Sequence, residues 1–316
     1  MGMPDLKIFS GNTNPEFAKK VADCAGVGLG VSEFGRFADG EVQVEIHESV
    51  RGANCFVIQS TCPPVNESYM ELFMILDALR RASPNEVTSV LPYYGYARQD
   101  RKVAPRAPIS AKAVANLLKT AGANRLLAVD LHSAQIQGFF DGPVDHLFAI
   151  PTLAAAWMDA HGGGEDFVAV SPDAGGVERV RAFAKKIGCS IAIIDKRRAG
   201  PNRVESVNLV GEVKGKTAII LDDMIDTAGT LTQAVDSILK NGAKRCFAIA
   251  THPLLSGPAV SRLTESGVEQ VWVTDTIPLK EPAVESGKFH VVSMAPVVAE
   301  AIKRINTHDS VSALFD

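Results

Sequence analysis

The feature that most constrains the fold is an alternation of two hydrophobic periods along the chain. Short apolar runs rich in β-branched residues predict strands at residues 54–59, 87–91, 125–131, 167–171, 190–195, 217–221, 246–251 and 268–274. Between several of them, apolar residues recur at i, i+3 and i+4, which predicts helices at 67–81, 109–121, 177–187 and 230–241. Strands that alternate with helices favour parallel sheets covered by helices, so we expect an α/β fold.

One part of this pattern occurs twice. Residues 55–92 and 218–253 each give a strand, a loop, a helix, a second strand and a proline. A duplication would produce two similar domains, each a mostly parallel sheet flanked by helices, and a chance similarity of two β–α–β units is the alternative. Pro151 and the glycines at 162–164 make residues 150–166 the expected boundary. We therefore expect domains at 1–149 and 150–316, with the tail 295–316 a candidate to pack on the first.

Composition excludes several classes of partner. The chain has 316 residues, 46% of them hydrophobic, which suits globular domains with real cores, and its net charge of −4 offers no general basic surface for nucleic acid. No apolar run reaches about 18 residues without a charge or a helix breaker, so we expect no membrane partner. The five cysteines contain no CxxC pair, which favours a reducing compartment and a cytoplasmic location.

The most informative segment is residues 218–231, AIILDDMIDTAGTL. Four apolar residues predict a buried strand, which leads into a loop carrying Asp222, Asp223 and Asp226 before a small-residue turn and a helix. Carboxylates repel phosphate, but Asp222 and Asp223 at a strand end are suited to accept hydrogen bonds from sugar hydroxyls. Acids that merely cap the following helix are the alternative interpretation.

The turn Asp226–Thr230 (DTAGT) is suited to phosphate. A helix N-terminus presents backbone N–H groups and the positive end of the helix dipole at one point. Ala228 and Gly229 let the backbone approach an anion closely. Thr227 and Thr230 add hydroxyl donors. Together with the acids before it, the turn predicts a site for a pentose phosphate.

Two further polar segments could bind ligands. Phe37, Asp39 and Glu41 offer an aromatic face and carboxylates that can accept from an amino group, although FADGE alone favours a plain hairpin turn. Arg98 with Gln99, which follow a predicted strand and its loop, could clamp phosphate groups, and a solvated charge run is the alternative.

Three further predictions concern metal and diphosphate. Asp173 follows a strand and is a natural Mg²⁺ ligand. Gly175 and Gly176 then open the next helix, which predicts a second anion-binding nest. Lys196 and Arg198 follow another strand, where a basic lid would stabilise transferring phosphates, and a solvated strand end is the alternative.

These segments carry a resemblance to a known family. Residues 218–231 are similar to the phosphoribosyl-diphosphate (PRPP) loop of type I phosphoribosyltransferase-like proteins. Five other segments extend the similarity: Phe37–Glu41 (FADGE), Tyr93–Arg101 (YYGYARQDR), Asp130–Ser133 (DLHS), Ser171–Gly176 (SPDAGG) and Asp195–Arg198 (DKRR). With them, the chain from about residue 5 to Phe315 resembles the ribose-phosphate pyrophosphokinases (PRPP synthases) of the phosphate-activated class. The alternatives are a salvage phosphoribosyltransferase and a non-catalytic partner of a synthase.

The resemblance implies transfer of the diphosphoryl group of ATP to the anomeric hydroxyl of ribose 5-phosphate, with Lys196 and Arg198 as catalytic residues. It implies ATP binding by Phe37, Asp39, Gly40, Glu41, Arg98 and Gln99. It implies ribose 5-phosphate binding by Arg198, Asp222, Asp223, Asp226, Thr227, Ala228, Gly229 and Thr230. It implies Mg²⁺ as cofactor, with His132 and Asp173 as ligands.

The resemblance also implies assembly and regulation. The family's ATP site crosses a subunit interface, so we expect a homo-oligomer, a hexamer built from dimers. Activating phosphate and inhibitory ADP would share a site formed by Ser49, Arg51, Arg106, Ser310, Ser312 and Phe315. Val103–Pro105 departs from a more polar pattern in some members, which leaves the strength of this regulation open.

Overall fold

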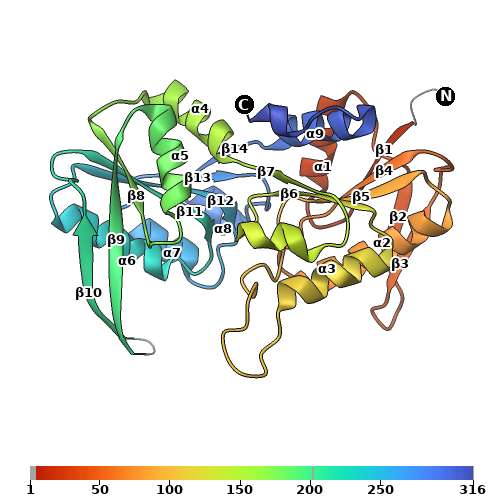
Figure 1. Cartoon of the computed structure of the whole chain (residues 1–316), viewed down its shortest axis with the longest axis horizontal. Coiled ribbons are helices and arrows are strands. Elements are labelled where there is room, and N and C mark those ends of the chain that lie inside the picture. Colours follow the sequence, from red (N-terminus) through yellow and green to blue (C-terminus); the bar gives the residue numbers. More distant parts are fainter. Residues whose placement is uncertain (1–4, 201–202, 316) are drawn as a thin grey trace. The chain divides into compact units, whose positions relative to one another are not determined.

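The structure is a computed structural model that describes residues 5–200 and 203–315, with the backbone alone at 195–200 and 203–208. The chain forms two compact units (Figure 1). Unit 1 runs to Phe148 and resumes at Met294, and unit 2 spans Ala149–Ser293. Among the helices that the structure describes, none is long and apolar enough to cross a membrane.

Unit 1 is built on a five-stranded sheet in which all neighbouring strands are parallel. Its strand order is β1 (Leu6–Ser10), β4 (Asn54–Ile58), β5 (Glu86–Leu91), β6 (Arg125–Val129), β7 (Val144–Leu147). The accompanying helices are α1 (Pro15–Ala25), α2 (Val65–Arg81), α3 (Ser110–Ala121), the short η1 (Ala134–Phe139), α9 (Ala295–Thr307) and the short η2 (Ser312–Leu314). A separate antiparallel hairpin is formed by β2 (Ser32–Arg36) and β3 (Val42–Ile46).

Burial explains why unit 1 has this form. All five residues of β4 are buried, as expected for a strand in the middle of a sheet covered on both faces. The buried face of α2 repeats at helical spacing through Leu72, Ile75, Leu76 and Leu79. At the other end of the unit's sequence, α9 packs against α1 (Figure 1). Two helices about 270 positions apart in the chain therefore close one core.

Unit 2 is built on a seven-stranded sheet. Its strand order is β10 (Arg203–Val210), β9 (Ser190–Gly200), β8 (Phe167–Ser171), β11 (Thr217–Ile225), β12 (Arg245–Pro253), β13 (Val271–Thr274), β14 (Phe289–Val292). The neighbours are parallel except β10 and β9. The helices of this unit are α4 (Ile150–His161), α5 (Val177–Ile187), α6 (Gly229–Lys240), α7 (Ala259–Glu265) and α8 (Glu281–Glu285).

The predicted fold class is confirmed, and one local prediction is wrong. We expected a boundary in residues 150–166; the two units divide just before it, between Phe148 and Ala149, and residues 150–161 form helix α4 of unit 2. Pro151 stands in the first turn and Gly162 is the C-cap, so the apparent breakers are the start and stop of a helix. Asp222 and Asp223 belong to β11 and not to a loop, because β11 continues to pair with β12 as far as Ile225.

Candidate active site

Three neighbouring strands of unit 2 carry predicted site residues at one edge of the sheet. β9, β8 and β11 are adjacent and parallel, so their carboxyl ends lie together. Asp173 follows β8, and Asp222 and Asp223 lie near the end of β11. This edge is where α/β proteins usually bind ligands.

The turn between β11 and α6 presents free backbone donors. Ala228 caps α6 in the left-handed conformation, with φ of 59°. Among the described residues, none accepts a hydrogen bond from the backbone amides of residues 227–230. These amides stand at the positive end of a twelve-residue helix. The turn therefore has the geometry of an anion site, as the sequence predicts.

Contacts from the next β–α connection hold this turn in place. Arg262 of α7 donates from Nη1 to the backbone oxygen of Thr227 at 3.0 Å. The backbone amide of Ser256 donates to the oxygen of Asp226, also at 3.0 Å. Sequence analysis did not identify Arg262, and no local pattern marks it, because it lies 35 positions from its partner.

The acid pair on β11 is buried to different degrees. The side chain of Asp223 is 8% exposed and that of Asp222 is 35% exposed. Burial is the main cause that raises the pKa of Asp222 to about 8, helped by the neighbouring Asp223 carboxyl group. Arg179 of α5 opposes this rise, with Nη1 at 4.0 Å from Oδ1 of each aspartate. Sequence analysis also missed Arg179.

Asp173 makes local contacts that the sequence did not predict. Its Oδ1 accepts hydrogen bonds from the backbone amides of Gly175 at 2.8 Å and Gly176 at 3.1 Å. These are the amides that we expected to bind diphosphate. The prediction of a second anion nest is therefore wrong for this structure, because an aspartate two residues before a glycine turn bonds the turn itself.

The predicted basic lid lies on the part of β9 that extends beyond its pairing with β8. That pairing ends at Ile193, and residues 196–198 pair only with β10 (Figure 1). Lys196 is opposite Val207, and Arg198 is opposite Val204. The side chains of Lys196 and Arg198 lie outside the described residues, so their predicted roles stay predictions. The backbone forms a two-stranded arm at this edge of the sheet.

In unit 1, the loops after β5 and β6 are joined. Arg98 and Gln99 follow β5 and are exposed, and exposed His132 follows β6. The amide of Gln135 donates to the carboxylate of Asp100 at 2.6 Å, which ties the two loops together. The predicted ATP-clamp residues and the predicted histidine ligand therefore lie on neighbouring loops at the carboxyl edge of this sheet.

Residues 37–41 form the tip of the β2–β3 hairpin, in agreement with the plain hairpin interpretation. The amide of Phe37 donates to the oxygen of Glu41 at 2.9 Å, and Gly40 has φ of 94°, which favours glycine. Phe37 is 53% exposed. One carboxylate oxygen of Asp39 accepts a hydrogen bond from the backbone amide of Glu41 at 3.0 Å. Because Phe37 is exposed, its ring is accessible to a ligand, and the predicted contact with adenine stays a prediction.

Metal binding depends on the two predicted ligands and on any other group of side chains that could hold a metal ion. Among the residues described, no three His, Cys, Asp or Glu side chains come together in a way that could hold a metal ion. His132 and Asp173 are both exposed. Magnesium commonly binds through one or two side chains and completes its shell with water and substrate phosphates. Each of these two side chains, taken by itself, fits that kind of site as a single protein ligand.

Of the six predicted regulatory residues, two are in direct contact. Ser310 and Ser312 lie with their hydroxyl oxygens 3.0 Å apart. The ring of Phe315 packs edge-on against that of Phe148, with centroids 5.5 Å apart. Within the described chain, no hydrogen bond or ion pair joins Ser49, Arg51 or Arg106 to the two serines.

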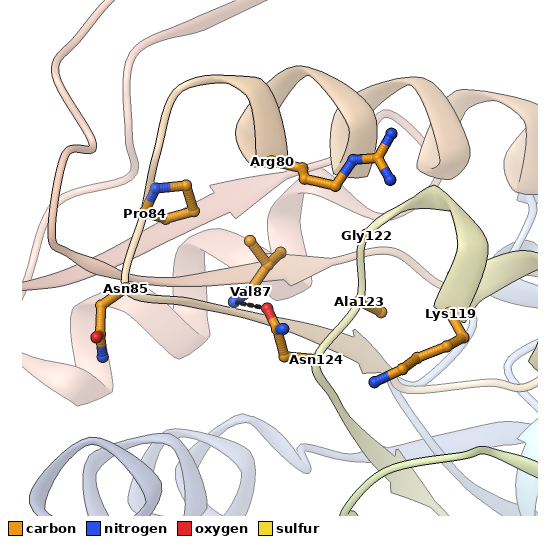
Figure 2. Close-up of a pocket in the computed structure, with 8 residues that line it drawn as sticks. All are labelled: Arg80, Pro84, Asn85, Val87, Lys119, Gly122, Ala123 and Asn124. Atoms are coloured by element: carbon orange, nitrogen blue, oxygen red, sulfur yellow. Dashed lines mark hydrogen bonds between the residues drawn. The ribbon is translucent and has the colours of Figure 1, made fainter.

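A cavity of about 290 Å³ lies away from all these residues, in unit 1 (Figure 2). Its lining is formed by Arg80, Pro84, Asn85, Val87, Lys119, Gly122, Ala123 and Asn124. Figure 2 shows the Asn124 side-chain oxygen accepting from the amide of Val87, at 2.8 Å. Asn85 and Asn124 directly precede β5 and β6, so the cavity lies at the amino edge of the sheet. It is separate from the predicted substrate site.

Comparison with known proteins agrees with both units. Residues 6–122 match the model for the N-terminal domain of ribose phosphate pyrophosphokinase, and residues 196–316 match a phosphoribosyl synthetase-associated domain. The ribose-phosphate pyrophosphokinases of Fusobacterium nucleatum and Bacillus subtilis are each 53% identical to this chain, with 99% of this chain and 98% of each relative covered.

A solved structure gives the same result. The phosphoribosylpyrophosphate synthetase of Mycobacterium smegmatis superposes with a TM-score of 0.91 at 44% identity, covering 96% of this chain and 99% of that one. The similarity extends over nearly the whole chain and includes the strands that carry the acid pair and the phosphate turn. The chain belongs to the ribose-phosphate pyrophosphokinase family.

Proposed function

We propose that this enzyme makes PRPP from ATP and ribose 5-phosphate. The anomeric oxygen of the sugar attacks the β-phosphorus, a new O–P bond forms, and the bond to the α-phosphate oxygen breaks. AMP leaves, and the hydroxyl proton is lost. The observation that supports this most directly is that the turn at 227–230, whose backbone amides are available to phosphate, follows the strand that carries the acid pair. The two full-length relatives above argue against a salvage transferase or a non-catalytic partner.

The proposed sugar site follows from charge. The 5-phosphate binds the amides and hydroxyls of Thr227–Thr230, where the helix dipole favours negative charge. The ring hydroxyls donate to Asp222 and Asp223, which lie one step back along β11. Asp226 begins the turn and separates the two groups. This order, acids then turn, matches the order of hydroxyls and phosphate along a pentose phosphate.

We assign the nucleotide to residues of unit 1. Arg98 and Gln99 bind its phosphates, and the hairpin tip with Phe37, Asp39, Gly40 and Glu41 binds adenine. His132 and Asp173 would hold Mg²⁺, which would neutralise phosphate charge when bound. Lys196 and Arg198 stabilise the diphosphoryl group during transfer. Positioning and charge stabilisation supply most of the rate, as in other phosphoryl transfers.

We extend the proposal to assembly, regulation and location. Exposure of the Phe37 ring supports contact with a second subunit, and we propose a hexamer built from dimers. Inorganic phosphate would activate, and ADP would inhibit, at a site that includes Ser310, Ser312 and Phe315. The five cysteines are free thiols, which supports a cytoplasmic location.

The deciding experiment separates AMP from ADP formation. Purified enzyme is incubated with ATP and Mg²⁺, with and without ribose 5-phosphate, at several phosphate concentrations, and nucleotides are resolved by chromatography. We expect sugar-dependent AMP together with an equal amount of PRPP. Formation of ADP, or AMP formation that does not require the sugar, would reject the proposed reaction. A rate that is indifferent to phosphate would reject the regulatory part alone.

A further inference from the structure

Arg179 stands beside the acid pair without bonding to it. Its Nη1 atom is 4.0 Å from Oδ1 of Asp222 and 4.0 Å from Oδ1 of Asp223. These distances permit strong attraction but exceed those of hydrogen bonds. The guanidinium side chain is only 19% exposed, so water screens its charge weakly. Arg179 therefore attracts both carboxyl groups without donating a hydrogen bond to either, while Oδ1 of Asp222 accepts a hydrogen bond from the backbone amide of Asp223 at 2.9 Å.

The place of Arg179 in its helix is unfavourable on local grounds. It is the third residue of α5, where the positive end of the helix dipole disfavours a cation. The same helix otherwise follows the usual rule, with Glu178 in its first turn and Lys185 and Lys186 in its last. A local rule broken in one place only, beside a ligand site, points to a functional reason for the residue.

Among the side chains that the structure describes, Arg179 is the positive charge that acts on Asp222. Position 222 is paired with Ala250 on β12, and the pairing of β11 with β8 ends two residues earlier, at Ile220 with Val170, so the paired neighbours near this level are apolar. The other acids at this edge, Asp173 and Asp226, are negative, and the guanidinium of Arg262 contacts the turn at Thr227. Without this nearby cation, the two adjacent carboxyl groups would repel each other more strongly, and the pKa of Asp222, which is already raised, would rise further.

We propose that Arg179 is a positioning residue for ribose 5-phosphate: it holds Asp222 and Asp223 side by side as a pair of hydrogen-bond acceptors for two neighbouring ring hydroxyls. Arg179 itself does not touch the sugar. This inference rests on the proposed function, because it takes the acid pair as the site of the sugar hydroxyls. It adds a residue on a different element, α5, to that site.

The test compares Arg179→Gln, Arg179→Lys and the control Arg181→Gln. Arg181 is on the same helix, is 60% exposed and pairs with Glu178, so it matches Arg179 in chemistry but is remote from the acid pair. The measurements are kcat/KM for each substrate across a range of pH and thermal melts of every variant. For Arg179→Gln we expect kcat/KM for ribose 5-phosphate to fall on the order of tenfold to a hundredfold, and its acid limb to move about one pH unit upward. The KM for ATP should change less than about twofold.

Charge rescue distinguishes positioning from packing. Arg179→Lys should restore most of the activity and the original acid limb, because it returns the positive charge. An unchanged acid limb in Arg179→Gln, or equal losses for both substrates, would overturn the proposal. If Arg179→Gln does not fold, the double variant with Asp222→Asn removes the repulsion and should fold; failure of that variant as well would assign Arg179 to packing and overturn the proposal.

A binding measurement separates this inference from the proposed reaction. Calorimetry with ribose 5-phosphate, in the presence of Mg²⁺ and an ATP analogue with a non-transferable α,β-methylene bond, reports sugar affinity without turnover. If wild-type enzyme binds the sugar and Arg179→Gln binds it less tightly in a pH-dependent way, the inference stands even where no PRPP is formed. If wild type and Arg179→Gln bind equally well, the inference fails whatever the reaction.

Discussion

Replacing Asp222 with asparagine should stabilise the protein, and more so at higher pH. Burial and the neighbouring Asp223 raise the pKa of Asp222 from its usual 3.8 to about 8 in the folded state. Between these values the folded protein retains a proton that the unfolded chain has released. Folding stability therefore falls as pH rises through this window, and the loss is complete above about pH 8. An asparagine side chain does not titrate, so the Asp222→Asn variant escapes this loss.

The structure limits the size of the effect. A shift of about four pKa units corresponds to about 5 to 6 kcal/mol if no screening occurs. The Asp222 side chain is 35% exposed, so water screens part of its charge, and we expect about 1 to 3 kcal/mol at pH 8. For a unit of this size, that difference raises the melting midpoint by roughly 2 to 10 °C.

The assay is thermal unfolding of wild type and Asp222→Asn from roughly pH 5 to pH 9, with Asp236→Asn as control. Asp236 is an exposed residue of α6, so its variant should stay within about 0.5 kcal/mol of wild type throughout. The difference for Asp222→Asn should increase with pH and level off above about pH 8. A difference that is constant, or that shrinks as pH rises, would refute the reasoning. The same variant should bind ribose 5-phosphate poorly, because the asparagine amide has one acceptor oxygen where the carboxyl group has two.

Three further predictions concern transfer, pH and ATP. Lys196→Ala or Arg198→Ala should lower kcat roughly 10²- to 10⁴-fold without changing the melting temperature, while Arg197→Ala should have a much smaller effect on kcat. Steady-state kinetics that show equal losses of kcat at all three positions would contradict the assignment of Lys196 and Arg198 to a catalytic lid. Burial lowers the pKa of His161, so its contribution to stability should be complete above about pH 6.5 and be lost as pH falls below that value. Melts of His161→Phe should lack that acid loss, and an unaltered pH profile would count against it. Asp39→Ala should raise the KM for ATP and spare ribose 5-phosphate, and equal changes for both would remove the adenine assignment.

Sequence reasoning recovered the elements in which local pattern and burial agree. The predicted strand 167–171 and helix 177–187 match β8 and α5 residue for residue. The helix predicted at 109–121 ends at Ala121 as expected, with Gly122 as its C-cap at φ of 131°. Some of the elements that were missed are short or half-exposed, such as β7 and β14, where few apolar residues carry a period. The longer helices α4 and α9 were missed as well, and both begin with a proline in their first turn. Strand ends were also placed too early at β9 and β11, because pairing with a neighbour extends a strand past its apolar run.

For the site, the sequence located residues that follow strands but not the residues that hold them. Asp173, Asp222 and the turn at 226–230 were identified because they continue a strand pattern. Arg179 and Arg262 act across helices, and their partners are set by packing that no local pattern encodes. A cation in the first turn of α5 was the one available signal for Arg179. The glycine nest failed because Asp173 competes for the same amides.

The contact between α1 and α9 has a consequence for synthesis of the protein on the ribosome. The buried face of α1, which includes Phe17 and Val21, emerges early, but its partner α9 follows all of unit 2. At about 5 to 20 residues per second, translation of Ala149–Ser293 takes roughly seven to thirty seconds. Unit 2 can complete its fold on the nascent chain during that delay. Unit 1 begins first and finishes last, so its uncovered α1 surface is where a chaperone would act on this chain.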